Sequence, residues 1–199
     1  MPRQPRQFIT SQNTLYHIVC RGNNRRRIFR RSRDYKKFLT IIIETKKKFP
    51  FYFYSYSFLP NHFHLEIETQ EITISKIMHQ INFSYVKYFH RQYQTVGHLF
   101  QDRFYSSVID KESYFWEVGR YIDLNAVRAG LTKGTEDYKW SSYSVYCQKD
   151  YDGDLIDRKR FLKFVDEDLE KVRIDYLKFV EEGLKKEEKP SFPLNDKMF

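Results

Sequence analysis

The feature that most constrains the fold is a pair of strand-like segments joined by a proline turn, at residues 51–68. The first segment, FYFYSYSF, is rich in the aromatic residues that favour strands, and Pro60-Asn61 is typical of a turn. Along the second segment side chains point alternately to two faces, so Phe63, Leu65 and Ile67 share one of them. The sequence therefore predicts a hairpin whose second strand has one apolar and one polar face.

The polar face of that second strand carries His62, His64, Glu66 and Glu68. A polar face is most simply explained as the solvent side of a sheet. Two imidazoles at positions i and i+2 can also converge on one cation, which makes the strand a candidate metal site. We expect Glu66 to face solvent, although its carboxylate is an alternative metal ligand.

Helical and strand-like patterns alternate on both sides of the hairpin. A strand is expected at 14–21, and a helix with apolar spacing follows Asp34, which can cap it. A second helix at 74–93 and a strand at 104–109 complete the order β-α-β-β-α-β. This order predicts an α+β, ferredoxin-like fold, an antiparallel sheet with helices on one face and strands one and three in its middle.

The rest of the chain is expected to be helical. A helix at 111–128 ends before Gly130, a good C-terminal cap, and another helix precedes Gly183. We expect one domain at 1–148 and a helical C-terminal extension at 149–199, with a flexible, Lys/Glu-rich end and no second catalytic domain.

Positive charge is concentrated in one stretch. The formal charge is +9, and seven arginines lie between positions 21 and 33. A solvated basic loop is the simplest explanation, but arginine rather than lysine at this density favours a phosphate-binding surface and so a nucleic acid. The arginines are Arg21, Arg25, Arg26, Arg27, Arg30, Arg31 and Arg33.

Several function classes lack their sequence signals. Cys20 and Cys147 are the only cysteines and form no CxxC motif, which argues against a disulfide framework and a thiolate zinc site. We find no membrane-length apolar run, no signal peptide in MPRQPRQF and no phosphate-binding G-x-x-x-x-G-K-[ST] loop. A cytoplasmic protein with no membrane partner is expected.

In the helix at 111–128, Tyr114, Val118, Tyr121 and Asn125 share one face, with Arg128 near it. A buried tyrosine that bonds a buried asparagine is the common structural explanation. If this face meets the histidine strand, Asn125 can supply a third metal ligand and Tyr121 a nucleophile. A divalent ion and a phenolate together can open a phosphodiester bond, leaving a 5′-phosphotyrosine and a free 3′-OH.

Five segments, in this order and spacing, resemble the REP-associated tyrosine transposases, a branch of the HUH single-tyrosine transposase superfamily. They are LYHIVCRGNNRRRIF, LPNHFHLEI, TVGHLFQDRF, RYIDLNAVRAGL and WSSY, and the tail segment YLKFVEEG resembles the longer members. The resemblance covers nearly the whole chain.

The resemblance implies an enzyme that cuts single-stranded DNA beside a hairpin, with Mg²⁺ or Mn²⁺ as cofactor. His62 and His64 match the HUH histidines, Tyr121 the nucleophile, and Asn125 the polar residue that completes the metal site. A monomer is expected, since the REP-associated branch looks monomeric. The candidate DNA-binding residues are Arg21, Arg25, Arg26, Arg27, Arg30, Arg103 and Arg128.

Two positions depart from the family pattern. Ala126 stands where the family usually has proline, which changes helix stiffness but removes no chemical group, and Glu66 stands where the family is usually apolar. Two other functions stay open: an RRM-like module that binds a nucleic-acid hairpin without cutting it, and a metal-dependent hydrolase that acts through activated water.

Overall fold

The computed structural model describes residues 13–185, so the flexible end expected at the C-terminus lies outside the described residues. Its sheet contains β1 (Leu15–Arg21), β2 (Phe51–Leu59), β3 (His62–Thr69) and β4 (Tyr105–Val108). The strands pair antiparallel in the order β2-β3-β1-β4, with β1 and β3 in the middle. The predicted ferredoxin-like arrangement is confirmed.

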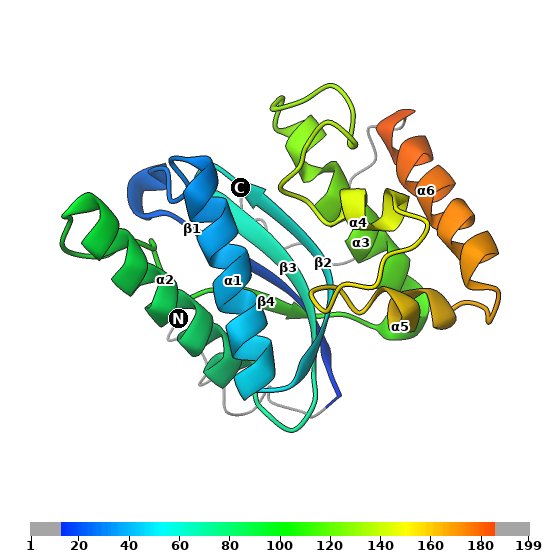
Figure 1. Cartoon of the computed structure of the whole chain (residues 1–199), viewed down its shortest axis with the longest axis horizontal. Coiled ribbons are helices and arrows are strands. Elements are labelled where there is room, and N and C mark those ends of the chain that lie inside the picture. Colours follow the sequence, from blue (N-terminus) through cyan, green and yellow to red (C-terminus); the bar gives the residue numbers. More distant parts are fainter. Residues whose placement is uncertain (1–12, 186–199) are drawn as a thin grey trace, which may run out of the picture.

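Two helices cover one face of the sheet, α1 (Ser32–Lys48) and α2 (Ile74–Tyr93), and a short 3₁₀ turn, η2 (Asn23–Arg25), precedes them. The second face is covered by α3 (Lys111–Arg128), with α4 (Tyr143–Cys147), α5 (Arg158–Lys163) and α6 (Leu169–Lys185) beside it. Figure 1 shows the sheet between these two groups of helices. The later helices thus turn a two-layer fold into three layers.

The face under α1 and α2 is an apolar core. Phe58, Phe63 and Leu65 are fully buried there, and the Phe38 ring of α1 lies 4.7 Å from Phe63 and 5.1 Å from Phe58. Tyr85 of α2 donates its hydroxyl hydrogen bond to the Ile28 carbonyl at 2.7 Å. The aromatic and aliphatic residues on this face of the strands therefore form the hydrophobic interface against which the apolar sides of α1 and α2 pack.

The face under α3 is different, and we call it the polar face, defined by His17, Ser55, Ser57, His64 and Glu66. All of these side chains are at most 2% exposed. The expectation that Glu66 faces solvent is wrong, because α3 and the helices after it cover this side of the sheet.

Helix α1 begins at Ser32, two residues before the Asp34 that was expected to cap it. The Asp34 carboxylate still serves the helix start, since it accepts hydrogen bonds from the N–H groups of Arg30 and Arg31, both at 2.8 Å. Tyr88 and Tyr93 of α2 donate to the same carboxylate, each at 2.7 Å. Asp34 thereby joins the arginine-rich loop to both helices of this face.

The C-terminal helices are attached to the sheet and to α3 by polar contacts. Asp157 accepts a hydrogen bond from the Phe53 N–H at 2.7 Å. Asp123 of α3 accepts from Ser142 at 2.7 Å and from Tyr176 of α6 at 2.9 Å. Within residues 13–185, no helix is both long and apolar enough to cross a membrane.

Candidate active site

The centre of the candidate site is Tyr121, whose ring lies against two histidines of the sheet. Its centroid is 5.7 Å from that of His64 and 5.6 Å from that of His17, both in edge-to-face geometry. His64 and His17 belong to the two central strands, β3 and β1, and Tyr121 comes from α3, which covers this face of the sheet. The predicted meeting of the tyrosine helix with the histidine strand is present in the structure.

Each of the two histidines of β3 has a neighbour at its Nδ1 atom. His62 donates Nδ1–H to Asn61 Oδ1 at 2.7 Å, because that oxygen can only accept. His64 Nδ1 lies 3.0 Å from His17 Nε2. The two β3 rings are 5.1 Å apart, centroid to centroid, so their remaining Nε2 atoms are the candidates for a metal.

Asn125 lies one helical turn after Tyr121 and is 8% exposed. Its Nδ2 donates to the Tyr121 carbonyl at 2.8 Å, which orients the amide and leaves Oδ1 as an acceptor. One further observation indicates that His62, His64 and Asn125 suit a divalent ion. His64 Nε2 is buried and has no hydrogen-bond partner among residues 13–185. In the same part of the chain, no group of three or more His, Cys, Asp or Glu side chains is arranged to hold a metal ion.

Burial keeps all three histidines neutral. It lowers the pKa of His17 to about 3 and, with the nearby Arg21 charge, that of His62 to about 4. The pKa of His64 falls well below its ordinary value through burial and then through His17, His62 and Arg21. Neutral imidazole is the form that ligates metals, so these rings need not lose a proton at pH 7.

The Tyr121 hydroxyl is buried, and burial raises its pKa to about 12. Arg128, a hydrogen bond from Asn125 and Arg21 act in the opposite direction. The Arg128 guanidinium carbon lies 5.6 Å from the Tyr121 ring centre. The phenol is therefore protonated in the free protein, with two positive charges placed to stabilise its anion.

The structure brings several candidate DNA-binding residues to the His62 end of the sheet. The Asn23 N–H bonds the Leu99 carbonyl and the Gln101 N–H bonds the Arg21 carbonyl, at 2.8 and 2.9 Å, which joins the arginine loop to the segment that carries Arg103. The Ile28 N–H bonds the Pro60 carbonyl at 2.8 Å, which attaches the loop to the hairpin turn. Arg25, Arg27 and Arg103 are exposed at this end.

Arg26 and Arg30 point instead toward α2. Arg30 lies over the Tyr93 ring at 4.6 Å and the Phe89 ring at 5.0 Å, and Arg26 lies 6.0 Å from the Phe89 ring. The predicted arginines thus form two groups: Arg21 and Arg128 beside Tyr121, and the loop arginines along the end of the sheet toward α2.

Two buried groups on the polar face, His17 and Glu66, were not among the predicted site residues. His17 alternates with Tyr16 and Ile18, a signal for the polar side of β1, but its contact with His64 depends on the β1–β3 register, in which His17 pairs with Glu66 and Val19 with His64. Burial raises the pKa of Glu66 well above its ordinary value; Ser55 lowers it and Asp123 raises it further. Burial therefore favours the neutral form of the Glu66 carboxyl.

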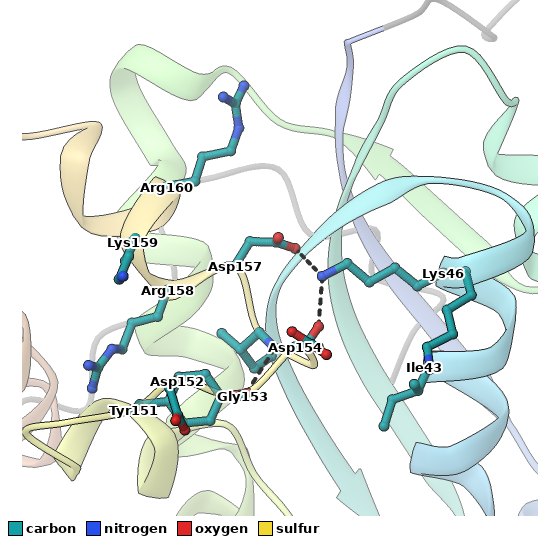
Figure 2. A pocket seen from close by; sticks show the side chains of 12 residues that line it. Ile43, Lys46, Tyr151, Asp152, Gly153, Asp154, Asp157, Arg158, Lys159 and Arg160 are labelled. Carbon is teal, nitrogen blue, oxygen red and sulfur yellow. Dashed lines mark hydrogen bonds and ion pairs between the residues drawn. The ribbon is translucent and has the colours of Figure 1, made fainter.

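An open pocket of about 590 Å³ lies away from this site, between α1, the loop at 151–157 and α5. Figure 2 shows Lys46 reaching into it and bonding Asp157 at 2.7 Å and the Asp154 carbonyl at 3.1 Å. None of the predicted site residues lines it. Five of its lining residues are lysine or arginine and three are aspartate.

Comparisons with known proteins identify the family of the chain and match its fold. The model of a family described as "Transposase IS200 like" matches residues 10–125, a range that includes both histidines of β3, Tyr121 and Asn125. The chain is also similar to a solved structure of a REP-associated tyrosine transposase bound to a REP hairpin, with a TM-score of 0.62 and 20% identity over 79% of this chain and 93% of the other. At that identity the likeness concerns the fold. No curated protein matches the chain.

Proposed function

Because the chain belongs to the IS200-like transposase family, we propose that it is a metal-dependent endonuclease and strand transferase. Its substrate is single-stranded DNA beside a hairpin, and its intermediate is a 5′-phosphotyrosine on Tyr121. The observation that carries the proposal is the contact of the Tyr121 ring with the His64 ring, 5.7 Å between centroids. A nucleophile and an imidazole ligand at this separation can act on the same phosphodiester.

The reaction exchanges one phosphate ester for another. The Tyr121 oxygen attacks phosphorus, the bond from phosphorus to the 3′ oxygen breaks, and that oxygen leaves as a free 3′-OH while the phenol loses its proton. Arg128 and Arg21 lower the pKa of the phenol and so favour its anion. Because the ester bond is conserved in the intermediate, the strand can be rejoined without nucleotide hydrolysis.

The residues proposed to hold Mg²⁺ or Mn²⁺ are His62, His64 and Asn125. When bound, either ion supplies a Lewis acid that polarises the phosphate. Asn61 holds the His62 ring by the 2.7 Å hydrogen bond to Nδ1, and the Asn125 amide is oriented by its bond to the Tyr121 carbonyl. Two imidazoles also accept zinc, so the metal has to be tested by substitution.

For the DNA, we propose a surface made of the arginine loop and its neighbours. Exposed arginines at the end of the sheet suit phosphates, and Arg21 and Arg128 beside Tyr121 suit the phosphate under attack. The hairpin in the similar structure is consistent with a hairpin substrate here. The proposed set is Arg21, Arg25, Arg26, Arg27, Arg30, Arg103 and Arg128.

We propose that one copy of the chain suffices. Tyr121 and His64 meet within a single chain, so no second subunit has to supply the nucleophile. The extension at 149–199 is proposed as a support of this domain at 1–148, because Tyr176 of α6 bonds Asp123 in the tyrosine helix.

The test is a denaturing gel of the purified protein with end-labelled single-stranded hairpin oligonucleotides, in Mn²⁺ or in EDTA. We expect a metal-dependent band of protein joined to DNA that is absent in Tyr121→Phe and weakened in His64→Ala. A Tyr121→Phe protein that cuts as well as the parent would falsify the assignment of the nucleophile.

A second function is favoured by one observation, the buried Tyr121 hydroxyl with its pKa raised to about 12. A phenol in this state suits a hairpin-binding module that no longer cuts. Tight binding of the same oligonucleotides without a nick or a joined band would support that module. A nick without the joined band would instead indicate a hydrolase that activates water.

A further inference from the structure

His17 is fully buried on the polar face, and the proposed reaction assigns it no role. It stands on the central strand β1, diagonally across from His64 on β3, because His17 pairs with Glu66 and Val19 with His64. Both strands are paired on both sides, so neither ring can move far from the other. The pair is therefore a fixed part of the site.

The geometry between the two rings is that of a hydrogen bond in the ring plane. Their planes differ by only 9°, and their centroids are 5.3 Å apart while His17 Nε2 and His64 Nδ1 approach to 3.0 Å. The two nitrogens therefore point toward each other between the ring centres. A face-to-face stack would not place them this way.

One proton must lie between these two nitrogens. Two imidazole nitrogens that approach to 3.0 Å share a single proton, so one nitrogen donates and the other accepts. If His17 Nε2 carries the proton, His64 is protonated at Nε2 and cannot bind a cation there. If His64 Nδ1 carries it, His64 Nε2 presents a lone pair.

The second arrangement matches the rest of the site. His62 already has its proton on Nδ1, fixed by Asn61, which leaves Nε2 as its donor atom. His64 Nε2 is buried and without a hydrogen-bond partner in the described chain, as expected of an atom that awaits a ligand.

We propose that His17 is a positioning residue that accepts the His64 Nδ1–H and so holds His64 in the tautomer that binds a divalent cation through Nε2. The inference rests on the proposed metal site. Asn61 and His17 then have equivalent tasks for the two ligands. Partners of this kind typically change metal affinity 10–100-fold when removed.

The first experiment needs neither metal nor a variant. Long-range ¹H–¹⁵N NMR correlations of the metal-free protein report which imidazole nitrogen carries the proton. We expect His64 in the Nδ1–H form and His17 with its proton on Nδ1. An Nε2–H form of His64 in the parent protein overturns the inference.

Variants then test whether His17 is the cause. His17→Met removes the acceptor, so we expect a mixture of His64 tautomers and a 10–100-fold weaker Mn²⁺ affinity by titration calorimetry. His17→Gln offers an amide oxygen near the original Nε2 position and is expected to restore both properties. His90→Met, on α2 away from the site, is the matched control and should change neither.

The outcomes separate the inference from the function it rests on. Unchanged His64 tautomer and Mn²⁺ affinity in a folded His17→Met overturns the role of His17. If the parent binds no Mn²⁺ while the tautomer responds to His17 as expected, the positioning role stands and the proposed metal site fails. If His17→Met does not fold, His17→Gln and the parent spectrum still decide the question.

Discussion

The two faces of one sheet serve different purposes in this molecule. On the face under α1 and α2, the Phe38 ring packs against the rings of Phe58 and Phe63. On the polar face, the Ser57 hydroxyl is buried without a hydrogen bond in the described part of the chain, and the buried Glu66 carboxyl has the Ser55 hydroxyl as its polar neighbour. The same strands supply both faces, because successive side chains alternate.

The difference indicates where stability and function reside. Apolar side chains of this size stabilise the fold by roughly 1.5–3 kcal/mol each when buried. A buried polar group without a partner lowers the free energy of unfolding by about 1–3 kcal/mol. A face that keeps such groups together is therefore less stabilising and is typical of a functional site. The polar face is the one that meets Tyr121.

The largest effect is expected from removing a single oxygen on the polar face. Tyr121→Phe should abolish covalent capture of DNA, a loss of at least about 10³-fold, because no other group supplies the attacking oxygen. Tyr56→Phe removes the same atom from a buried tyrosine whose strand position pairs with Leu65, on the apolar side. Quantified gels of both variants against the parent measure the contrast, and equal losses would contradict it.

Truncating the apolar face should instead reduce stability. Phe63→Ala leaves a cavity beside Phe38 and Phe100 and should lower the free energy of unfolding by about 3–5 kcal/mol. Urea unfolding followed by circular dichroism gives the value. A loss below about 1 kcal/mol would mean that this face is not the main source of stability.

A substitution on the polar face should instead raise the free energy of unfolding. Glu66→Gln replaces a carboxyl that folding has to keep protonated with an amide that does not titrate, so it is expected to stabilise the metal-free protein at pH 7 by about 1–3 kcal/mol. The pKa of Glu66 is higher in the folded protein than in the unfolded chain. The parent therefore loses stability as the pH rises above the pKa of the unfolded chain, by up to about 1.4 kcal/mol per pH unit. Asp123, with its pKa raised to about 7, contributes a second slope of the same sign.

Unfolding curves of Glu66→Gln and the parent in EDTA, from pH 4 to pH 8, test this. The stability difference should be near zero at the acid end and grow with pH. A constant difference would show that Glu66 has the same protonation in the folded and unfolded states.

The smallest effect is expected at single exposed arginines. Arg27→Ala should weaken hairpin binding by about 1 kcal/mol or less and reduce the salt dependence by about one counterion. Lys36→Ala, an exposed charge on α1, is the matched control. Fluorescence anisotropy at several salt concentrations measures both, and equal changes in the two variants would argue against a dedicated arginine surface.

Local patterns predicted most of the fold. The α2 and α3 bounds agree with the apolar spacing, and the order of strands followed from the order of elements. The short helices α4 and α5 were not predicted, because five or six residues show no periodicity.

The candidate site divides in the same way. Alternation along β3 placed His62, His64 and Glu66 on one side, but only the tertiary packing of α3 and α6 decides that this side is closed to solvent. The contact between His17 and His64 depends on pairing between strands 47 positions apart, which no local pattern encodes. Sequence thus predicted which residues share a face, and the structure shows what covers it.

The central claim is that the Tyr121 oxygen forms the covalent bond to the DNA phosphate. Mass spectrometry of the trypsin-digested adduct tests it most directly. Trypsin cuts after Arg120 and Arg128, so peptide 121–128 contains Tyr121 as its only tyrosine, whereas Tyr114 lies in peptide 112–120. The account predicts a nucleotide mass on peptide 121–128, or on Tyr121 in fragment ions of 112–128 if the modification blocks the cut. A nucleotide on Tyr114 or on any other tyrosine would contradict it.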